Sequence, residues 1–376
     1  MKEKNIWSSL NGDNLNCLDD VASFLHQEFS QNGADRIWSK EYLEWKLGGK
    51  NPAGNGFLSY AVSEGRIVGV ATLTKKRALY NGRELLIGET GDTYTLSSII
   101  RNGKPETLSV LDANPKAYIN KSIFGRLVSE NIYRASKNGV ELVYGTPNKK
   151  SLPGYIKRLG FLSYKNTAKY RPSTNLLLKQ YPVLKPFSNF LYLTESLLFS
   201  LQRLVYSLTL GRGINSSVEV PSIEEIDNLW SLVKPLTGLS LIRDGKYWFY
   251  RYINHPLAKY KFISFRRQNR LVAIVVAREF SYRKDRRVLS IVEWMSEDQL
   301  SIGYLLSETL NFVKKRNIEY YYYYSSAQNA ASMMPKTNLF LYSSEAPVVF
   351  FNNELSKKIS QSGSHFEFHI GNSDAV

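Results

Sequence analysis

The sequence predicts an α/β (α+β) protein of two tandem domains, each a mixed, mostly antiparallel sheet flanked by helices. The chain has 376 residues, which is more than one typical core accommodates. Its hydrophobic content of 43% is that of a folded protein. From Val218 the order of expected helices and strands starts again. A repeat this long indicates two copies of one domain rather than a solenoid.

The first domain is expected over residues 1–172. Apolar residues at helical spacing predict helices over 19–30 and 39–47. Three strands bounded by turn residues then follow, over 57–62, 66–75 and 84–90. Asn81-Gly82, just before the third strand, is a strong signal for a tight hairpin. The domain is therefore expected to open with two helices and an antiparallel meander.

A buried strand is expected to start at Val140 and to end at Thr146-Pro147-Asn148, because proline removes a donor and disfavours helix in its neighbour. Ser151 is a candidate cap for a short helix that stops at Gly160. Asn148, Ser151 and Tyr155 would then project from the carboxyl end of a strand. Ligands of open α/β sheets bind at such ends.

Three motifs resemble the last strand and helix of a GNAT-type (N-acyltransferase) domain: Tyr144-Gly145-Thr146-Pro147-Asn148, Ser151-Leu152-Pro153-Gly154-Tyr155 and Leu159-Gly160-Phe161. The resemblance implies that the strand splays from its neighbour and that the thioester arm of acetyl-CoA, or another acyl-CoA, enters the gap as co-substrate. It implies that Tyr155 protonates the leaving thiolate, and that Asn148 and Ser151 contact the cofactor. No metal is expected. The alternative is a strand–turn–helix of another α/β fold, in which Tyr155 only packs.

Two carboxylates end the third strand, in Gly88-Glu89-Thr90-Gly91-Asp92-Thr93. GNAT domains often carry Gly-Asp-Thr at this point. Acyl transfer to an amine requires removal of the ammonium proton, by a carboxylate directly or through water. Glu89 and Asp92 are therefore the candidate general bases, and the alternative is that they only hydrogen-bond the turn.

The loop before the next helix, expected over 122–137, departs from the GNAT pattern. An extra stretch, residues 96–114, precedes it. Glycines usually let backbone amides approach the CoA pyrophosphate at a helix start. Asn120 and Ser122 stand at those positions, with Lys121 between them. These three residues are the candidate phosphate-binding group, and whether they still bind CoA is left open.

Residues 173–216 are expected to form an amphipathic helical linker. Phe187 to Leu210 is rich in Leu, Phe and Tyr, but Glu195 and Arg203 argue against a membrane span, because a charge at the bilayer centre costs about 2.5–3.5 kcal/mol. The helix is expected either to pack across the domain junction or to lie on an anionic membrane.

The second domain is expected over residues 217–353, followed by a polar tail over 354–376. A helix, three strands, a helix and a strand repeat the earlier order, over 223–233, 262–266, 271–280, 288–294, 302–315 and 319–324. No tyrosine stands where Tyr155 does in the first domain. The second domain is therefore predicted to be non-catalytic.

The net charge of +16 implies attraction to polyanions such as nucleotides, CoA, anionic lipid or RNA. A single cysteine, Cys17, excludes an internal disulfide framework and a cysteine-rich zinc site. The amino end shows no apolar signal core. We expect a cytoplasmic protein, with peripheral contact at the inner face of the membrane as an open question.

These observations predict an acyl-CoA-dependent N-acyltransferase acting on a small-molecule or carrier-linked amine. By family analogy alone, the acceptor is an amino sugar in surface-polysaccharide synthesis. One alternative is a Fem-like transferase that uses aminoacyl-tRNA, the only case in which tRNA is a partner. The other is a degenerate, non-catalytic GNAT-like binding protein.

Overall fold

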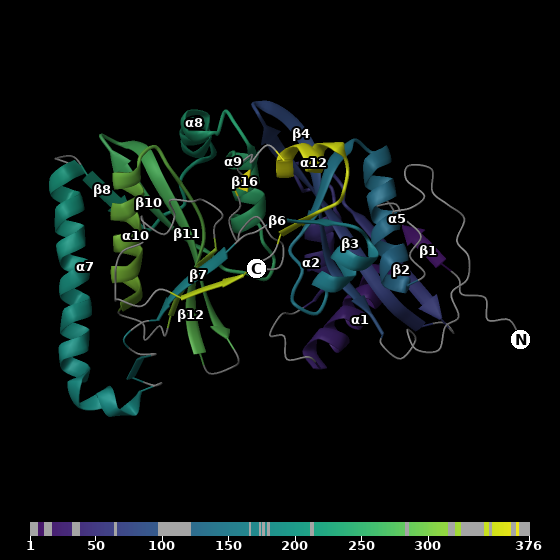
Figure 1. Cartoon of the computed structure of the whole chain (residues 1–376). Coiled ribbons are helices and arrows are strands. Elements are labelled where there is room, and N and C mark those ends of the chain that lie inside the picture. The colour runs from purple at the N-terminus through teal and green to yellow at the C-terminus, as the bar shows by residue number, and fades with distance from the viewer. Residues whose placement is uncertain are drawn as a thin grey trace, which may run out of the picture.

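The computed structural model describes residues 7–10, 17–31, 38–63, 66–96, 122–164, 167–172, 174, 177–178, 181–210, 214–282, 286–314, 320–324, 342–345, 348–361 and 366–367. Two sheets lie side by side, each with helices against its faces (Figure 1). The expected α/β class, with mixed sheets flanked by helices, is confirmed.

The first sheet contains nine of the described strands, of which seven form the continuous order β1-β2-β3-β4-β5-β15-β6. Neighbours in this order are antiparallel except β4 and β5, which are parallel. The seven strands are β1 (Trp7–Leu10), β2 (Phe57–Ser63), β3 (Arg66–Tyr80), β4 (Arg83–Thr95), β5 (Val140–Gly145), β15 (Val348–Phe350) and β6 (Leu162–Tyr164). The hairpin between β3 and β4 forms as predicted, with Asn81 and Gly82 both at positive φ, 49° and 78°.

Helices cover both faces of this sheet. Helix α5 (Ile123–Lys137) lies on one face, where Leu127, Val128 and Ile132 pack against strand residues. Helices α1 (Leu18–Gln31) and α2 (Lys40–Leu47) form a core of their own on the other face, with apolar residues of β2 and β3. The two faces therefore present different surroundings to the end of β4.

The second sheet has the order β14-β7-β13-β12-β11-β10-β8. Its strands are β8 (Ile214–Ser217), β10 (Lys261–Arg267), β11 (Arg270–Tyr282), β12 (Arg286–Ser296), β13 (Tyr320–Tyr324), β7 (Thr167–Pro172) and β14 (Tyr342–Glu345). Its described helices are α8 (Ile223–Val233), α9 (Gly245–Trp248), the π-helix η4 (Phe249–Ile253) and α10 (Gln299–Lys314). Among the pairs of neighbours in this order, only β12 and β13 are parallel.

Each sheet includes strands from the other half of the chain. Strand β7 follows β6 in the sequence, yet it pairs with β13 and β14 in the second sheet. Strand β15 follows β14, yet it pairs with β5 and β6 in the first sheet. The predicted boundary at residue 172 therefore leaves β7 with a half of the chain whose sheet it does not join. The division into domains stays a prediction.

Further contacts fasten the halves together. Strand β9 (Leu239–Leu241) pairs with the end of β3, and β16 (Phe366–Glu367) pairs with β9. Arg77 on β3 forms an ion pair with Asp244, at 2.6 Å. Trp45 stacks on Tyr250, with 4.9 Å between ring centroids.

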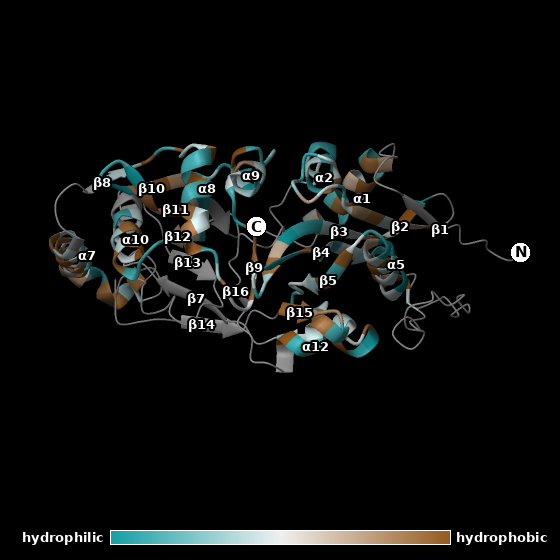
Figure 2. Cartoon of the chain, turned by 90° about the horizontal axis from the view of Figure 1, so that it is seen from above, coloured by the Kyte–Doolittle hydropathy of each residue, from teal (hydrophilic) through white to brown (hydrophobic). Residues whose placement is uncertain are grey.

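The segment predicted to be a helical linker, residues 173–216, contains helix α7 (Ser188–Leu210), preceded by the 3-10 helix η3 (Pro182–Phe187). Helix α7 lies on α10, which covers the face of the second sheet that is turned away from the first sheet (Figures 1 and 2). The expectation that it packs across the junction is therefore wrong. No helix among the described residues is long and apolar enough to cross a membrane.

The carboxyl end also differs from expectation. Residues predicted to begin a polar tail form helix α12 (Glu354–Gln361), in which Ser356 and Ile359 are fully buried. Ile359 packs with residues of β4 and β5. This helix therefore contributes to the core that the first sheet shares with the second half.

Candidate active site

The candidate site lies where β4 outruns β5. The two strands pair along the whole of β5, and the last pair joins Thr90 and Gly145. Strand β4 continues to Thr95, so the strands part only beyond β5 and do not splay within it as the resemblance implied. The pairing of β4 with β3 also shifts here, since Thr72 faces Gly91 and Val70 faces Tyr94. The shift is a β-bulge at Asp92, which has a φ of +41°.

Tyr155 reaches this point from the π-helix η2 (Gly154–Arg158). Its ring stands edge-on to Phe124 and Phe161, with centroid separations of 5.3 and 5.1 Å. Its hydroxyl lies 3.2 Å from Thr90 Oγ1 and 3.5 Å from Thr93 Oγ1. The ring is therefore part of the core, while the hydroxyl contacts Thr90 and Thr93 of β4.

Burial raises the pKa of Tyr155, and the nearby Glu89 carboxylate adds to the rise. The hydrogen bonds from Thr90 and Thr93 and the Lys46 ammonium act in the opposite direction, and the net shift is upward. The phenol therefore keeps its proton at neutral pH. A group in this state can donate a proton but cannot act as a base.

Asp92 turns toward α2. Its Oδ2 accepts a hydrogen bond from Lys46 Nζ at 2.7 Å, and Oδ1 accepts one from Trp38 Nε1 at 3.4 Å. Both side chains of the ion pair are almost fully buried. Gly91 provides the room, since a Cβ there would lie 3.1 Å from Lys46 Nζ.

Glu89 lies on the other face of β4 from Thr90, because side chains alternate along a strand. Its Oε2 accepts a hydrogen bond from Lys76 Nζ at 2.6 Å, and both side chains are buried. Lys76 also lies over the ring of Tyr144. The two candidate bases therefore flank the end of β4, and a lysine neutralises each.

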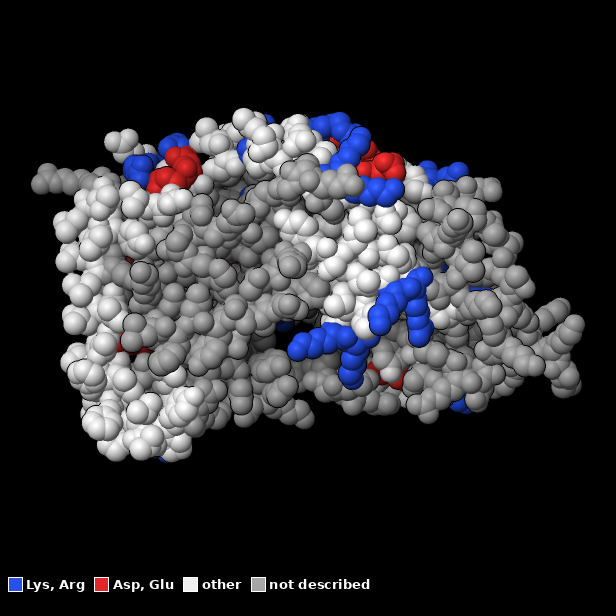
Figure 3. Space-filling model, in the orientation of Figure 1, with Lys and Arg blue, Asp and Glu red and all other residues white. Residues whose placement is uncertain are grey.

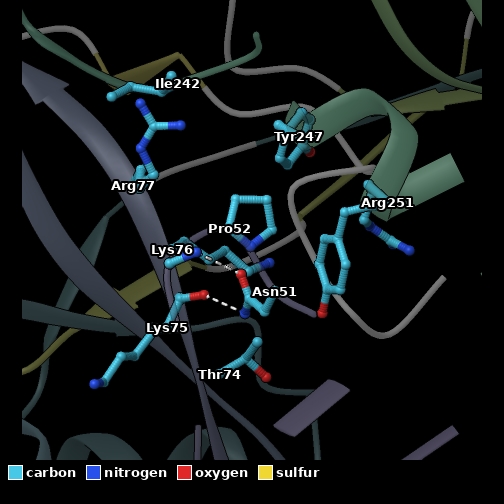
Figure 4. Close-up of a pocket in the computed structure, with 11 residues that line it drawn as sticks. Asn51, Pro52, Thr74, Lys75, Lys76, Arg77, Ile242, Tyr247 and Arg251 are labelled. Carbon is cyan, nitrogen blue, oxygen red and sulfur yellow. Dashed lines mark hydrogen bonds between the residues drawn. The ribbon is translucent and has the colours of Figure 1, made fainter. Parts of the chain in front are cut away.

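A hollow between the two halves of the chain adjoins Glu89 through Lys76 (Figure 4). In Figure 4 the β3 residues Lys75, Lys76 and Arg77 lie across the hollow from Tyr247 and Arg251. The Asn51 side chain donates to the carbonyl of Lys75 at 2.9 Å. Of the eleven residues that line the hollow, four are lysines or arginines and two are tyrosines.

Of the five predicted cofactor contacts, the structure describes Ser122, Asn148 and Ser151. Asn148 Oδ1 accepts hydrogen bonds from the backbone N–H groups of Lys150 and Ser151, both at 2.9 Å. Asn148 therefore caps the turn that the sequence assigned to Ser151, although Gly160 ends the segment as predicted, at a φ of +68°. Ser122 caps α5 by accepting from Gly125 N at 3.1 Å. Asn120, Lys121 and most of the insertion over 96–114 lie outside the described residues.

Basic side chains surround η2. Lys149, Lys150, Lys157 and Arg158 are all exposed on this segment. Figure 3 shows Lys and Arg side chains gathered over this part of the surface. An anionic ligand that approached the end of β5 would meet this positive charge.

The sequence analysis missed Lys46, Lys76, Thr90 and Thr93 as members of the site. A signal for Lys46 exists, because it shares a helix with Tyr42 and Leu43 and lies one turn from them on their face. A signal for Lys76 is strand alternation, which places it on the opposite face from Lys75 and Arg77. Neither signal names the carboxylate partner.

No protein-family model matches the sequence, and no curated protein matches it. Among solved structures, the fold resembles a conserved protein of unknown function from Enterococcus faecalis, described as a probable N-acyltransferase, with a TM-score of 0.56, 10% identity and coverage of 92% of this chain and 72% of that chain. It also resembles a GCN5-related N-acetyltransferase from Anabaena variabilis (0.53, 10%, 92% and 72%). A third resemblance is to Saccharomyces cerevisiae N-myristoyltransferase with bound myristoyl-CoA (0.55, 11%, 93% and 84%).

These likenesses show that the chain has the fold of GCN5-related N-acyltransferases, the fold that the GNAT resemblance implied. Because they cover more than nine-tenths of the chain, they extend over both sheets. At identities of 10–11% these likenesses show the fold alone, and the activity has to be argued from the residues of the site.

Proposed function

We propose that the chain is an acyl-CoA-dependent N-acyltransferase whose reaction takes place beside Thr90 and Thr93 of β4, where the pairing of β4 with β5 ends. The observation that carries the proposal is the position of the Tyr155 hydroxyl, 3.2 Å from Thr90 Oγ1 and 3.5 Å from Thr93 Oγ1, where the pairing of β4 with β5 ends. The amine nitrogen attacks the thioester carbonyl carbon, the carbon–sulfur bond breaks, and the electron pair goes to sulfur. Tyr155 then gives its proton to the thiolate.

The attacking amine must lose a proton, and Glu89 and Asp92 are the bases we propose. Each is hydrogen-bonded to a lysine, so an acceptor ammonium would share or displace that lysine. Glu89 is paired with Lys76, which lines the hollow between the halves, and we therefore favour that side as the approach of the acceptor. Asp92 borders α2.

The acceptor that we propose is an amine on a phosphate-bearing carrier, such as an amino sugar. The support is electrostatic, since exposed basic residues surround η2 and the chain carries a net charge of +16. The same charge would serve the phosphates of CoA or a tRNA, so the binding experiment below separates these ligands.

We propose that the second half has no CoA site of its own. Asp298 caps the start of α10, accepting from Ser301 N at 2.7 Å. Glu297 precedes it and pairs with Arg270. A phosphate at this helix start would meet two carboxylates, whereas the first turn of α5 contains no acidic residue.

Calorimetric titration with CoA and acetyl-CoA, followed by a thiol-release assay with amine acceptors, tests the proposal. Tyr155→Phe keeps the ring and removes the proton donor. We expect kcat to fall by about 10²–10⁴-fold while the Kd for CoA is unchanged. Tyr133→Phe on α5 is the matched control, and we expect it to keep full activity.

Unchanged turnover in Tyr155→Phe would reject the assigned role. If CoA does not bind but tRNA does, with steep salt dependence, the Fem-like alternative replaces the proposal. If neither binds, the chain is a non-catalytic binding protein.

A further inference from the structure

Helix α7 packs against the rest of the protein through one of its faces. Arg203 Nε pairs with Glu308 Oε1 on α10 at 2.6 Å. Tyr206 fits over Gly303 of α10, where a Cβ would come within 2.7 Å of its ring. Glu195 is also buried. The charged residues of α7 therefore lie on the side toward the protein or are paired there.

The opposite face carries an apolar stripe. Its members recur every three or four residues, which places them on one side of a helix. Each is between 49% and 73% exposed: Phe190, Leu193, Leu197, Leu201, Leu204 and Leu208. From Phe190 to Leu208 the stripe is about 27 Å long at 1.5 Å per residue. It contains no charged residue, and Figure 3 shows the described surface along α7 as almost free of charge.

The exposed area of this stripe exceeds what a monomer usually leaves uncovered. With Phe187, Leu198 and Val205 beside it, the stripe exposes the equivalent of about five whole side chains. At roughly 150–200 Å² each, this is on the order of 800–1,000 Å². The largest apolar patch on a typical monomer is about 300–600 Å². A standard protein interface buries about 800 Å² on each partner.

The charge distribution along α7 distinguishes two candidate partners of the stripe, an anionic membrane and a second copy of this chain. Helices that lie on anionic membranes carry Lys and Arg on their polar face. Tyr206 and Arg203 of α7 contact α10, and Arg203, the one basic residue of α7, is paired with Glu308. A second copy of the stripe is uncharged and of the same length, so it needs no basic residue on α7.

We propose that two copies of this chain pair through the α7 stripe, as antiparallel helices about a twofold axis. Such an interface is self-complementary, because the same patch faces itself. Leucines at regular spacing along the stripe provide the ridges that interlock at a shallow crossing angle. The proposal does not depend on the catalytic assignment.

Sedimentation equilibrium of the full chain tests the proposal. We expect a mass of 86.0 kDa, twice the 43.0 kDa of one chain. The double variant Leu197→Glu/Leu204→Glu should sediment as a monomer with unchanged circular dichroism. The control, Leu232→Glu/Leu236→Glu, changes two leucines of the second half that are 63% and 77% exposed, and it should remain a dimer.

A wild-type chain that is monomeric at tens of micromolar overturns the proposal, whatever the variants do. Flotation with phosphatidylserine-containing vesicles then decides the membrane alternative. A monomer that floats, and loses flotation in the double variant, would make the stripe a membrane contact. A double variant that is folded and still dimeric would also overturn the proposal.

Discussion

Replacing Lys46 with methionine would leave the Asp92 carboxylate inside the protein without its lysine partner. The two side chains are 1% and 3% exposed, and Nζ lies 2.7 Å from Oδ2. Breaking a buried ion pair from one side costs about 3–5 kcal/mol, because the remaining charge has lost both water and partner. We therefore expect Lys46→Met to lower the free energy of unfolding by about that amount.

The chain offers a matched control in Lys40, on the same helix. Its Nζ lies 2.9 Å from Asp19 Oδ2, but these side chains are 42% and 65% exposed. Exposed pairs contribute about 0–1 kcal/mol. Urea unfolding followed by tryptophan fluorescence, with Lys46→Met, Lys40→Met and wild type side by side, measures the difference in midpoint and slope.

If the free energy of unfolding falls no more in Lys46→Met than in Lys40→Met, the assignment of a buried Lys46–Asp92 ion pair to the site is refuted. The double variant Lys46→Met/Asp92→Asn sharpens the test, because it removes the stranded charge. We expect the double variant to be more stable than Lys46→Met alone.

Two further predictions follow from burial and from strand exchange. The raised pKa of Tyr155 means that its contribution to stability is complete below the ordinary value of 10.0 and is lost as pH rises through the raised value. Tyr155→Phe should therefore lose less stability than wild type above pH 10 in thermal unfolding. Residues 1–172 and 173–376, made separately, should each fail to give cooperative unfolding, and co-expression should restore one folded complex. Independent folding of either piece would contradict the exchange of β7 and β15.

Much of the fold could be predicted because its signals are local. Apolar spacing identified α1, α2, α5, α8 and α10, and the Asn81-Gly82 turn fixed the hairpin between β3 and β4. The end of the segment at Gly160 followed from its left-handed backbone. Each of these features depends on residues that are neighbours in the chain.

The parts that escaped prediction depend on distant partners. Strands β7 and β15 contain six and three residues, and such short segments do not reveal which strand they pair with. Lysine is a residue type that usually lies on the surface, so the sequence alone does not mark Lys46 and Lys76 as buried. Only the folded chain brings them to Asp92 and Glu89. The side chain of Asn148 caps the adjacent turn, and its contact with cofactor stays a prediction.

Through strand exchange, the second half also contacts the residues that surround Tyr155. Val349 of β15 pairs with Gly145, at the last residue of β5. The next residue after β15, Phe351, donates its N–H to Val143 O at 2.8 Å and packs against Phe161, at 5.5 Å between centroids. Phe161 in turn stands edge-on to Tyr155. The position of the Tyr155 phenol is thus set from both halves, so under the proposed function the second half, which has no counterpart of Tyr155, is required to place the proton donor.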